Sequence, residues 1–255
     1  MTVLRVGLLQ HDIVWEDRAA TLAHLEPMVA SAADQGAGLV LATELFAVGF
    51  SMDTAKVGEP VDGPTSAWLS EQASRHGVWV GGSIPEIGPG ADRPTNCFVL
   101  AAPDGTQHRY AKVHGFTYGG EDEHYAPGDH ETTVDIDGVR VTPFVCYDLR
   151  FADRWWARAA DTDLYVCVAS WPQQRRAHWT ALLQARAIEN LAYVAGVNRI
   201  GSGGGIDYAG DSRIIGPFGE LLADGTDAGE CVLVADVDTD VVAKTRARYP
   251  FLADR

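Results

Sequence analysis

Short apolar runs alternate with segments of helical periodicity along the chain, and this alternation constrains the fold more than any other feature of the sequence. The run VLRVGLLQ at 3–10 predicts a strand. In the segment that follows it, Leu22, Leu25, Val29 and Ala33 recur at the spacing of one helical face. A chain that repeats this order of strand and helix is expected to build an α/β fold.

The other predicted elements continue the alternation and add hairpins in the middle of the chain. They are helices over 65–77, 151–160 and 174–190, hairpins turning at the Asp-Gly pairs 104–105 and 137–138, and apolar strands at 39–44, 78–83 and 163–170. The glycine-rich run at 201–205 lacks the pattern of a phosphate-binding loop and is predicted to be a flexible loop. Since no repeat or linker divides the sequence, a single domain over 1–255 is expected.

The charge balance excludes several classes of partner. The chain has 35 acidic and 20 basic residues, a formal net charge of −15. Such a surface repels phosphate backbones and anionic lipids, so neither nucleic acid nor a membrane is expected as a partner. The N-terminal apolar run contains Arg5 and is too short for a signal peptide, and no window suits a membrane span. We therefore expect a soluble, cytoplasmic protein with reduced thiols.

One of the four cysteines stands in an unusual context. Cys97, Cys167 and Cys231 lie within or at the start of apolar strands and are expected to be packed thiols. Cys146 is instead predicted to be the last residue of its strand, followed by YDLRF and a helical pattern. A strand-to-helix turn exposes a side chain beside free backbone N–H groups, which favours a thiolate and can hold an oxyanion. This context makes Cys146 a candidate nucleophile, with a packed thiol as the alternative.

Three segments in order, LATELF around Glu44, YAKVHGF around Lys112 and FVCYDLRF around Cys146, resemble the nitrilase or carbon-nitrogen hydrolase superfamily. The resemblance covers almost the whole chain, and the segments CYDLRF and QARAIEN are most similar to those of omega-amidases. It implies a four-layer αββα sandwich and a Glu-Lys-Cys triad. It also implies a homodimer, since members of this family usually pair.

The resemblance implies a role for each residue of this triad. Cys146 is expected to attack an amide carbonyl, release ammonia and leave a thioester that water cleaves. Glu44 is expected to be the general base, and Lys112 is expected to hold the oxyanion together with the backbone N–H of Tyr147. The positive charge of Lys112 is expected to favour the thiolate. Glu121 is expected to support Lys112, although Glu123 is close enough to confuse the register.

Substrate-binding residues are predicted at the edges of these segments. The candidates, each with plain packing or solvation as the alternative, are Phe116, Tyr125, Trp171, Arg175, Arg176 and Tyr208. The two arginines are considered because the resemblance implies dicarboxylate monoamides, such as alpha-ketoglutaramate or succinamate, as substrates. Asp148 and Arg150 are expected to pair and brace the turn of the nucleophile.

Several alternatives stay open within and beyond this family. Another small amide, such as an N-carbamoyl compound or a deaminated-glutathione-type molecule, is the main alternative substrate, and a nitrile is a weaker one. A non-catalytic scaffold is disfavoured because Glu44, Lys112 and Cys146 are all present. His114, His124 and His130 match no common zinc spacing, so neither a metal nor an organic cofactor is expected.

Overall fold

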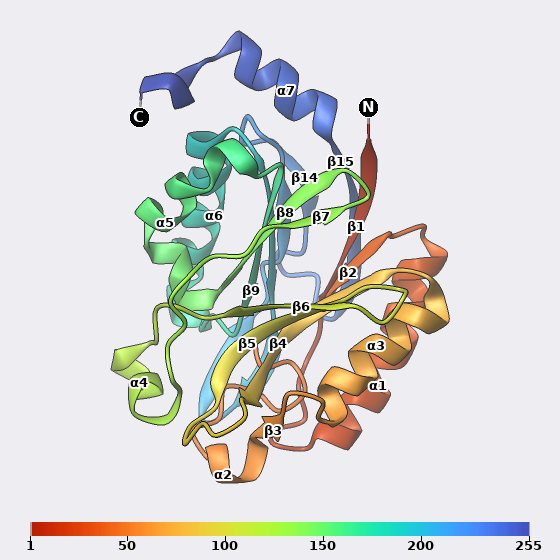
Figure 1. The fold of residues 1–255 in the computed structure, drawn as a ribbon, viewed down its shortest axis with the longest axis vertical. Coiled ribbons are helices and arrows are strands. Elements are labelled where there is room, and N and C mark those ends of the chain that lie inside the picture. The colour runs from red at the N-terminus through yellow and green to blue at the C-terminus, as the bar shows by residue number, and fades with distance from the viewer. Residues whose placement is uncertain (1, 255) are drawn as a thin grey trace.

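The computed structural model describes residues 2–254, which form two β-sheets packed face to face with helices on both outer sides (Figure 1). The first sheet has the strand order β15-β1-β2-β4-β5-β6, and β3 pairs with β4. Its strands are β1 Val3–Gln10, β2 Leu39–Leu41, β3 Glu59–Pro60, β4 Trp79–Ile87, β5 Thr95–Ala101, β6 Gln107–Ala111 and β15 Cys231–Asp238.

The second sheet has the strand order β14-β13-β10-β9-β8-β7. Its strands are β7 Val134–Ile136, β8 Val139–Val145, β9 Leu164–Ala169, β10 Tyr193–Asn198, β13 Arg213–Ile215 and β14 Leu221–Asp224. The central strands β8, β9 and β10 are parallel to one another. Because both faces of these strands are covered, they read as continuous apolar runs, such as LYVCVA, and do not alternate with polar residues.

Helices cover the outer faces and complete four layers. The α-helices of residues 2–254 are α1 Arg18–Asp34, α2 Thr54–Val57, α3 Pro64–His76, α4 Glu121–His124, α5 Ala152–Ala157, α6 Arg176–Asn190 and α7 Thr239–Arg248. Figure 1 shows α1 and α3 on one side of the sheets and α5 and α6 on the other. Between the sheets, β1 packs against β10 and β5 packs against β8. The four-layer αββα arrangement that the resemblance implied is present.

Most predicted elements are present, with shifted ends. Both predicted hairpins form, as β5–β6 and β7–β8, with Gly105 and Gly138 at positive φ in their turns. The strand predicted over 39–44 ends at Leu41, and the helix predicted over 151–160 is α5 followed by a short 3₁₀ segment, Ala159–Asp161. The expected flexible loop at 201–205 is wrong, because its first three residues belong to β11 Ile200–Gly203 and its last two form the turn to β12 Ile206–Ala209.

No helix within residues 2–254 has both the length and the apolar character that crossing a membrane requires.

Candidate active site

The candidate site lies where strands of both sheets end. Cys146 follows β8 and Ser170 follows its parallel neighbour β9, while Lys112 follows β6 in the other sheet. Glu44 lies three residues beyond β2. Since the sheets pack face to face, these strand ends bring residues that are far apart in the sequence into one place. The sequence predicted Cys146, Lys112 and Glu44 but not Ser170, and the structure brings all four together.

The backbone on both sides of this site is strained. Cys146 is not the last residue of its strand, as predicted, but the first of a 3₁₀ turn, Cys146–Arg150, with a φ of 46°. Leu45, directly after Glu44, has a φ of 43°. Left-handed conformations are uncommon for residues other than glycine and persist where the surrounding structure enforces them, often at functional sites.

Glu44, Lys112 and Glu121 form a buried network of charges. Lys112 Nζ donates to Glu44 Oε1 at 2.9 Å and to both carboxylate oxygens of Glu121, at 2.9 and 2.8 Å. Burial opposes the charge on Lys112, but the carboxylates of Glu121 and Glu44 outweigh it and raise the pKa of the lysine well above its ordinary value. Glu121, and not Glu123, is therefore the second carboxylate beside Lys112.

Asn96 and two backbone groups complete the network. Asn96 Nδ2 donates to Glu44 Oε1 at 2.9 Å and to Glu121 Oε1 at 3.0 Å, so that it bridges the two carboxylates. The N–H of Ser170 donates to Glu44 Oε2 at 2.8 Å, and the N–H of Phe116 donates to Glu121 Oε2 at 2.6 Å. Sequence reasoning missed Asn96, because a lone asparagine in an apolar strand shows no pattern.

The thiol of Cys146 lies within hydrogen-bonding reach of the Glu44 carboxylate. Burial and the charge of Glu44 raise the pKa of this thiol well above its ordinary value, and the opposing effect of Lys112 is smaller. Lys112 thus favours the thiolate, as expected, but burial and Glu44 outweigh its effect and favour the neutral thiol.

Asp148 holds the turn of the nucleophile, but not by the predicted pairing with Arg150. Its carboxylate accepts from Tyr110 Oη at 2.8 Å, from the N–H of His114 at 2.9 Å and from the N–H of Val145 at 3.2 Å. These bonds tie the turn to β6 and to the loop that follows Lys112. Arg150 Nη2 instead lies 3.2 Å from His178 Nδ1, and the Arg150 guanidinium lies over the rings of Tyr147 and Trp171.

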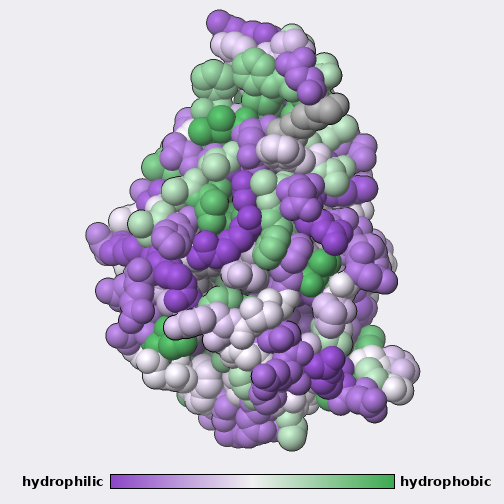
Figure 2. All heavy atoms as spheres, turned by 90° about the vertical axis from the view of Figure 1, so that its left-hand side faces the viewer, coloured by the Kyte–Doolittle hydropathy of each residue, from purple (hydrophilic) through white to green (hydrophobic). Residues whose placement is uncertain are grey.

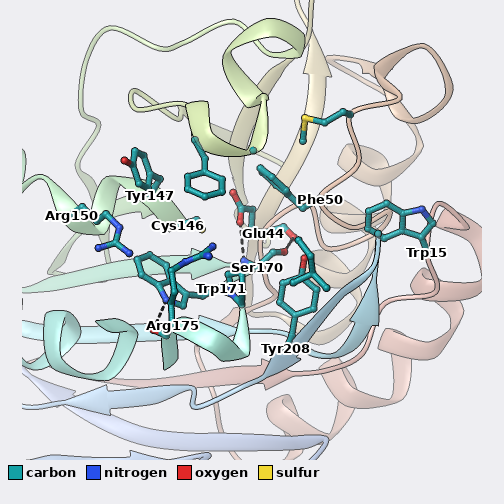
Figure 3. A pocket seen from close by; sticks show the side chains of 16 residues that line it. Trp15, Glu44, Phe50, Cys146, Tyr147, Arg150, Ser170, Trp171, Arg175 and Tyr208 are labelled. Carbon is teal, nitrogen blue, oxygen red and sulfur yellow. Dashed lines mark hydrogen bonds between the residues drawn. The ribbon is translucent and has the colours of Figure 1, made fainter. Parts of the chain in front are cut away.

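A cavity of about 280 Å³ opens above Cys146 and Glu44 (Figure 3). Of the predicted substrate-binding residues it is lined by Phe116, Trp171, Arg175 and Tyr208. Tyr147 and Arg150, for which the sequence analysis proposed other roles, also line it, and the lining residues that it did not propose are Trp15, Phe50, Met52, Gly119, Ser170, Pro172, Gly204 and Ile206. Gly204 belongs to the glycine-rich run, which therefore contributes a wall of the site.

Two predicted substrate-binding residues lie elsewhere. Tyr125 is buried behind Lys112, where its hydroxyl donates to the carbonyl of Ser51 at 2.8 Å, so that it is a packing residue. Arg176 does not line the cavity above Cys146, because its guanidinium pairs with Asp211 at 2.6 Å and with Asp227 at 2.9 Å. Nothing in the sequence distinguished Arg176 from its neighbour Arg175, since both follow the same SWPQQ segment.

The other three cysteines differ from Cys146 in their surroundings. Cys97 and Cys167 are buried within β5 and β9, and Cys231 is half-buried at the start of β15. Burial raises the pKa of Cys97 and Cys167, as it does for packed thiols. His114, for which a metal role was considered, stacks on Phe151 with its Nδ1 2.9 Å from Asp148 Oδ1.

Comparison with known proteins finds relatives that match this chain over almost its whole length. The family model described as carbon-nitrogen hydrolase matches residues 5–247. The chain is 38% identical to the omega-amidase YafV of Yersinia enterocolitica, over all of this chain and 97% of that protein. It is 29% identical to the 2-oxoglutaramate amidase of Bacillus subtilis, over 98% of this chain and 96% of that protein.

A solved structure shows the same fold. The CN-hydrolase superfamily protein XC1258 of Xanthomonas campestris superposes with a TM-score of 0.95 at 36% identity, over 100% of this chain and 98% of that one. This structure and the first sequence relative each match the chain over its full length. The chain belongs to the carbon-nitrogen hydrolase family, in its omega-amidase-like branch, and is a hydrolase that acts on amides.

Proposed function

We propose that the protein is an omega-amidase that hydrolyses short dicarboxylate monoamides, such as alpha-ketoglutaramate or succinamate, through a thioester on Cys146. The proposal rests on the position of Cys146 beside Glu44 in the wall of one cavity, with the buried Lys112 2.9 Å from the Glu44 carboxylate. The omega-amidase and 2-oxoglutaramate amidase relatives support the substrate class.

In the first half of the reaction, Glu44 takes the thiol proton as Cys146 Sγ attacks the amide carbonyl carbon. The carbonyl oxygen becomes an oxyanion, with Lys112 and the backbone N–H of Tyr147 as its donors. Tyr147 is the second residue of its 3₁₀ turn, so its N–H has no partner in a preceding turn. Protonated Glu44 holds Lys112 less strongly, which releases an N–H for the oxyanion. The C–N bond then breaks and ammonia leaves with the proton of Glu44.

The second half of the reaction repeats these steps with water. Glu44 removes a proton from water, whose oxygen attacks the thioester carbonyl. The C–S bond breaks, the carboxylic acid leaves and Cys146 recovers its proton. Glu121 accepts from Lys112, and Asn96 donates to both Glu121 and Glu44, so these two residues keep Lys112 and Glu44 in position throughout.

The test is ammonia release from succinamate, alpha-ketoglutaramate, glutamine, N-carbamoyl amino acids and a simple nitrile. Turnover of the first two is expected, with no turnover by Cys146→Ala and a loss of about 10²–10⁴-fold in Glu44→Gln. Acid-quenched wild-type protein is expected to carry the acyl mass on Cys146. Activity only on N-carbamoyl compounds or other amides would keep the chemistry and reject the substrate class. Full activity of Cys146→Ala would reject the mechanism.

We also propose that two copies of the chain form a homodimer. The support is a group of exposed apolar side chains near the C-terminal end, in which Phe218 is 61% exposed and Phe251 is 55% exposed. The ring of Tyr249 lies between them, with centroid distances of 5.1 and 5.7 Å. On the side where α5 and α6 lie, apolar side chains are scattered among hydrophilic ones (Figure 2). Light scattering is expected to give a dimer that Phe218→Asp dissociates, and a monomeric wild type would contradict this.

A further inference from the structure

The cavity above Cys146 has two arginines in its wall that no carboxylate of the protein neutralises. Arg150 and Arg175 both line it, and within residues 2–254 neither has an Asp or Glu oxygen within 4.0 Å. The guanidinium of Arg175 lies 5.4 Å from the ring centroid of Phe116, and that of Arg150 lies 4.8 Å from the ring centroid of Trp171. The guanidinium of Arg175 is thus supported by an aromatic ring alone, and that of Arg150 by aromatic rings and His178, in a wall that is mostly apolar.

Such unpaired cations are notable in this chain because acidic residues outnumber basic ones, 35 to 20. Arg176, the next residue along, is neutralised by Asp211 and Asp227. A guanidinium in a partly desolvated site is stabilised by a carboxylate that accepts two parallel N–H bonds. The missing partner of Arg175 is therefore expected to come from a ligand.

The positions of the residues around the cavity indicate how such a ligand is oriented. In Figure 3, Arg150, Arg175, Tyr147 and Trp171 gather at one end of the site and Trp15 lies at the other, with Cys146 and Glu44 between them. An amide whose carbonyl reaches Cys146 can thus place its leaving nitrogen toward Glu44 and its acyl chain toward the arginines. A short chain with a terminal carboxylate satisfies both ends at once.

Arg175 rather than Arg150 is placed to receive this carboxylate. Arg150 is already engaged, because its Nη2 lies 3.2 Å from His178 Nδ1 and its guanidinium is within 6 Å of two rings. No side-chain hydrogen bond of Arg175 occurs within the described chain, whereas its backbone carbonyl accepts from Trp171 Nε1 at 2.9 Å. The backbone of Arg175 is therefore fixed while its guanidinium is available.

Arg175 also lies at a boundary between two spaces. It lines both the cavity above Cys146 and an outer cavity of about 560 Å³ that contains Tyr118, Gln173, Gln174 and Asp207. A carboxylate bound at this boundary fixes the distance between the scissile amide and the far end of the substrate. We propose that Arg175 is the specificity-determining residue that binds the distal carboxylate of the substrate, with the charge of Arg150 in support; this rests on the proposed amidase function.

The first test compares two substrates of the same length in four variants, which are Arg175→Gln, Arg175→Lys, Arg150→Gln and Arg75→Gln. Succinamate carries the distal carboxylate, whereas butyramide replaces it with a methyl group. In Arg175→Gln, the KM for succinamate is expected to rise roughly 10- to 100-fold, as for the loss of a charged hydrogen-bonded pair, with the KM for butyramide within twofold. The KM of Arg175→Lys for succinamate is expected to lie between those of the wild type and Arg175→Gln, because lysine keeps the charge and loses the paired N–H groups. The control Arg75→Gln removes an equal charge from exposed α3 and is expected to change neither value.

This comparison can reject the role of Arg175 in binding the distal carboxylate. An unchanged KM for succinamate in Arg175→Gln, or an equal rise for both substrates, would overturn the assignment. So would a selective loss in Arg150→Gln that Arg175→Gln does not share.

A second test separates this proposal from the proposed function. Calorimetry measures the binding of succinate, the acid product, to Cys146→Ala and to the double variant that also carries Arg175→Gln. The double variant is expected to bind roughly 10- to 100-fold more weakly. Equal affinity would overturn the role of Arg175 even if the wild type hydrolyses succinamate. Conversely, an inactive wild type that binds succinate through Arg175 would reject the reaction and keep the anion site.

Discussion

At Cys146 the chain places a reactive group on strained backbone and surrounds it with negative charge. The φ of 46° directs the side chain out of the line of β8, and Asp148 fixes that conformation through Tyr110, His114 and Val145. The thiol thus faces Glu44 in a setting that opposes ionisation. The proposed proton transfer to Glu44 would form the thiolate without changing the total charge of the site.

This arrangement predicts that the Cys146 thiol ionises only at high pH. Because burial and Glu44 raise its pKa well above the ordinary value of 9.0, the thiolate is expected to be absent at neutral pH and to form only above pH 9. The measurement is the pH dependence of thiolate ultraviolet absorbance, taken as the difference between the wild type and Cys146→Ala. A thiolate already complete at pH 7 would show that Lys112 dominates the site.

At the scale of elements, the site depends on how closely α6 approaches the second sheet. Gly196 lies in β10, and a Cβ built there would overlap Leu183 Cδ1 of α6 and lie 2.7 Å from Leu183 Cδ2. The absence of a side chain at Gly196 lets Leu183 pack directly on the strand. Leu183 lies in the middle of α6, the helix that begins directly after Arg175.

Gly196→Ala is therefore expected to destabilise the fold by about 1–3 kcal/mol, as overpacking of a core does. Gly88→Ala is the matched control, because no heavy atom lies within 4 Å of a Cβ at that position. Its free energy of unfolding is expected to stay within about 0.5 kcal/mol of the wild type. Urea unfolding of both variants makes the comparison, and equal stability would mean that Leu183 relaxes without cost.

At the scale of the whole molecule, His11 links stability to pH. This residue follows β1 and is buried, with Nδ1 2.7 Å from the carbonyl of Asp12 and Nε2 3.1 Å from Thr43 Oγ1. Desolvation lowers its pKa from 6.5 to about 4. The unfolded chain binds a proton at this histidine before the folded protein does, so the stabilisation is complete above pH 6.5 and is lost as the pH falls toward 4.

Between pH 7 and pH 5, His11 alone is expected to lower the free energy of unfolding by about 2 kcal/mol. Chemical denaturation at the two pH values measures this change. In His11→Asn, the difference between the two pH values is expected to shrink by that amount, whatever the variant costs at pH 7. If the difference is the same in both proteins, His11 is not the group that titrates.

The sequence by itself determined the α/β class, the order of most elements and the members of the charged network. Glycine and Asp-Gly signals are local, so both hairpin turns could be predicted. The resemblance was specific because three motifs occur in the same order as in the family. It identified Glu44, Lys112, Cys146 and Glu121 without any knowledge of their distances.

Only the tertiary structure decided how these residues act on one another. The hydrogen bonds of Asn96, Asp148 and Tyr125 join segments that are distant in the sequence. The ion pairs of Arg176 distinguish it from its neighbour Arg175, although both residues are arginines. The protonation of the thiol likewise depends on the sum of nearby charges and on burial. These quantities arise from packing the two sheets together, and no local pattern of residues encodes them.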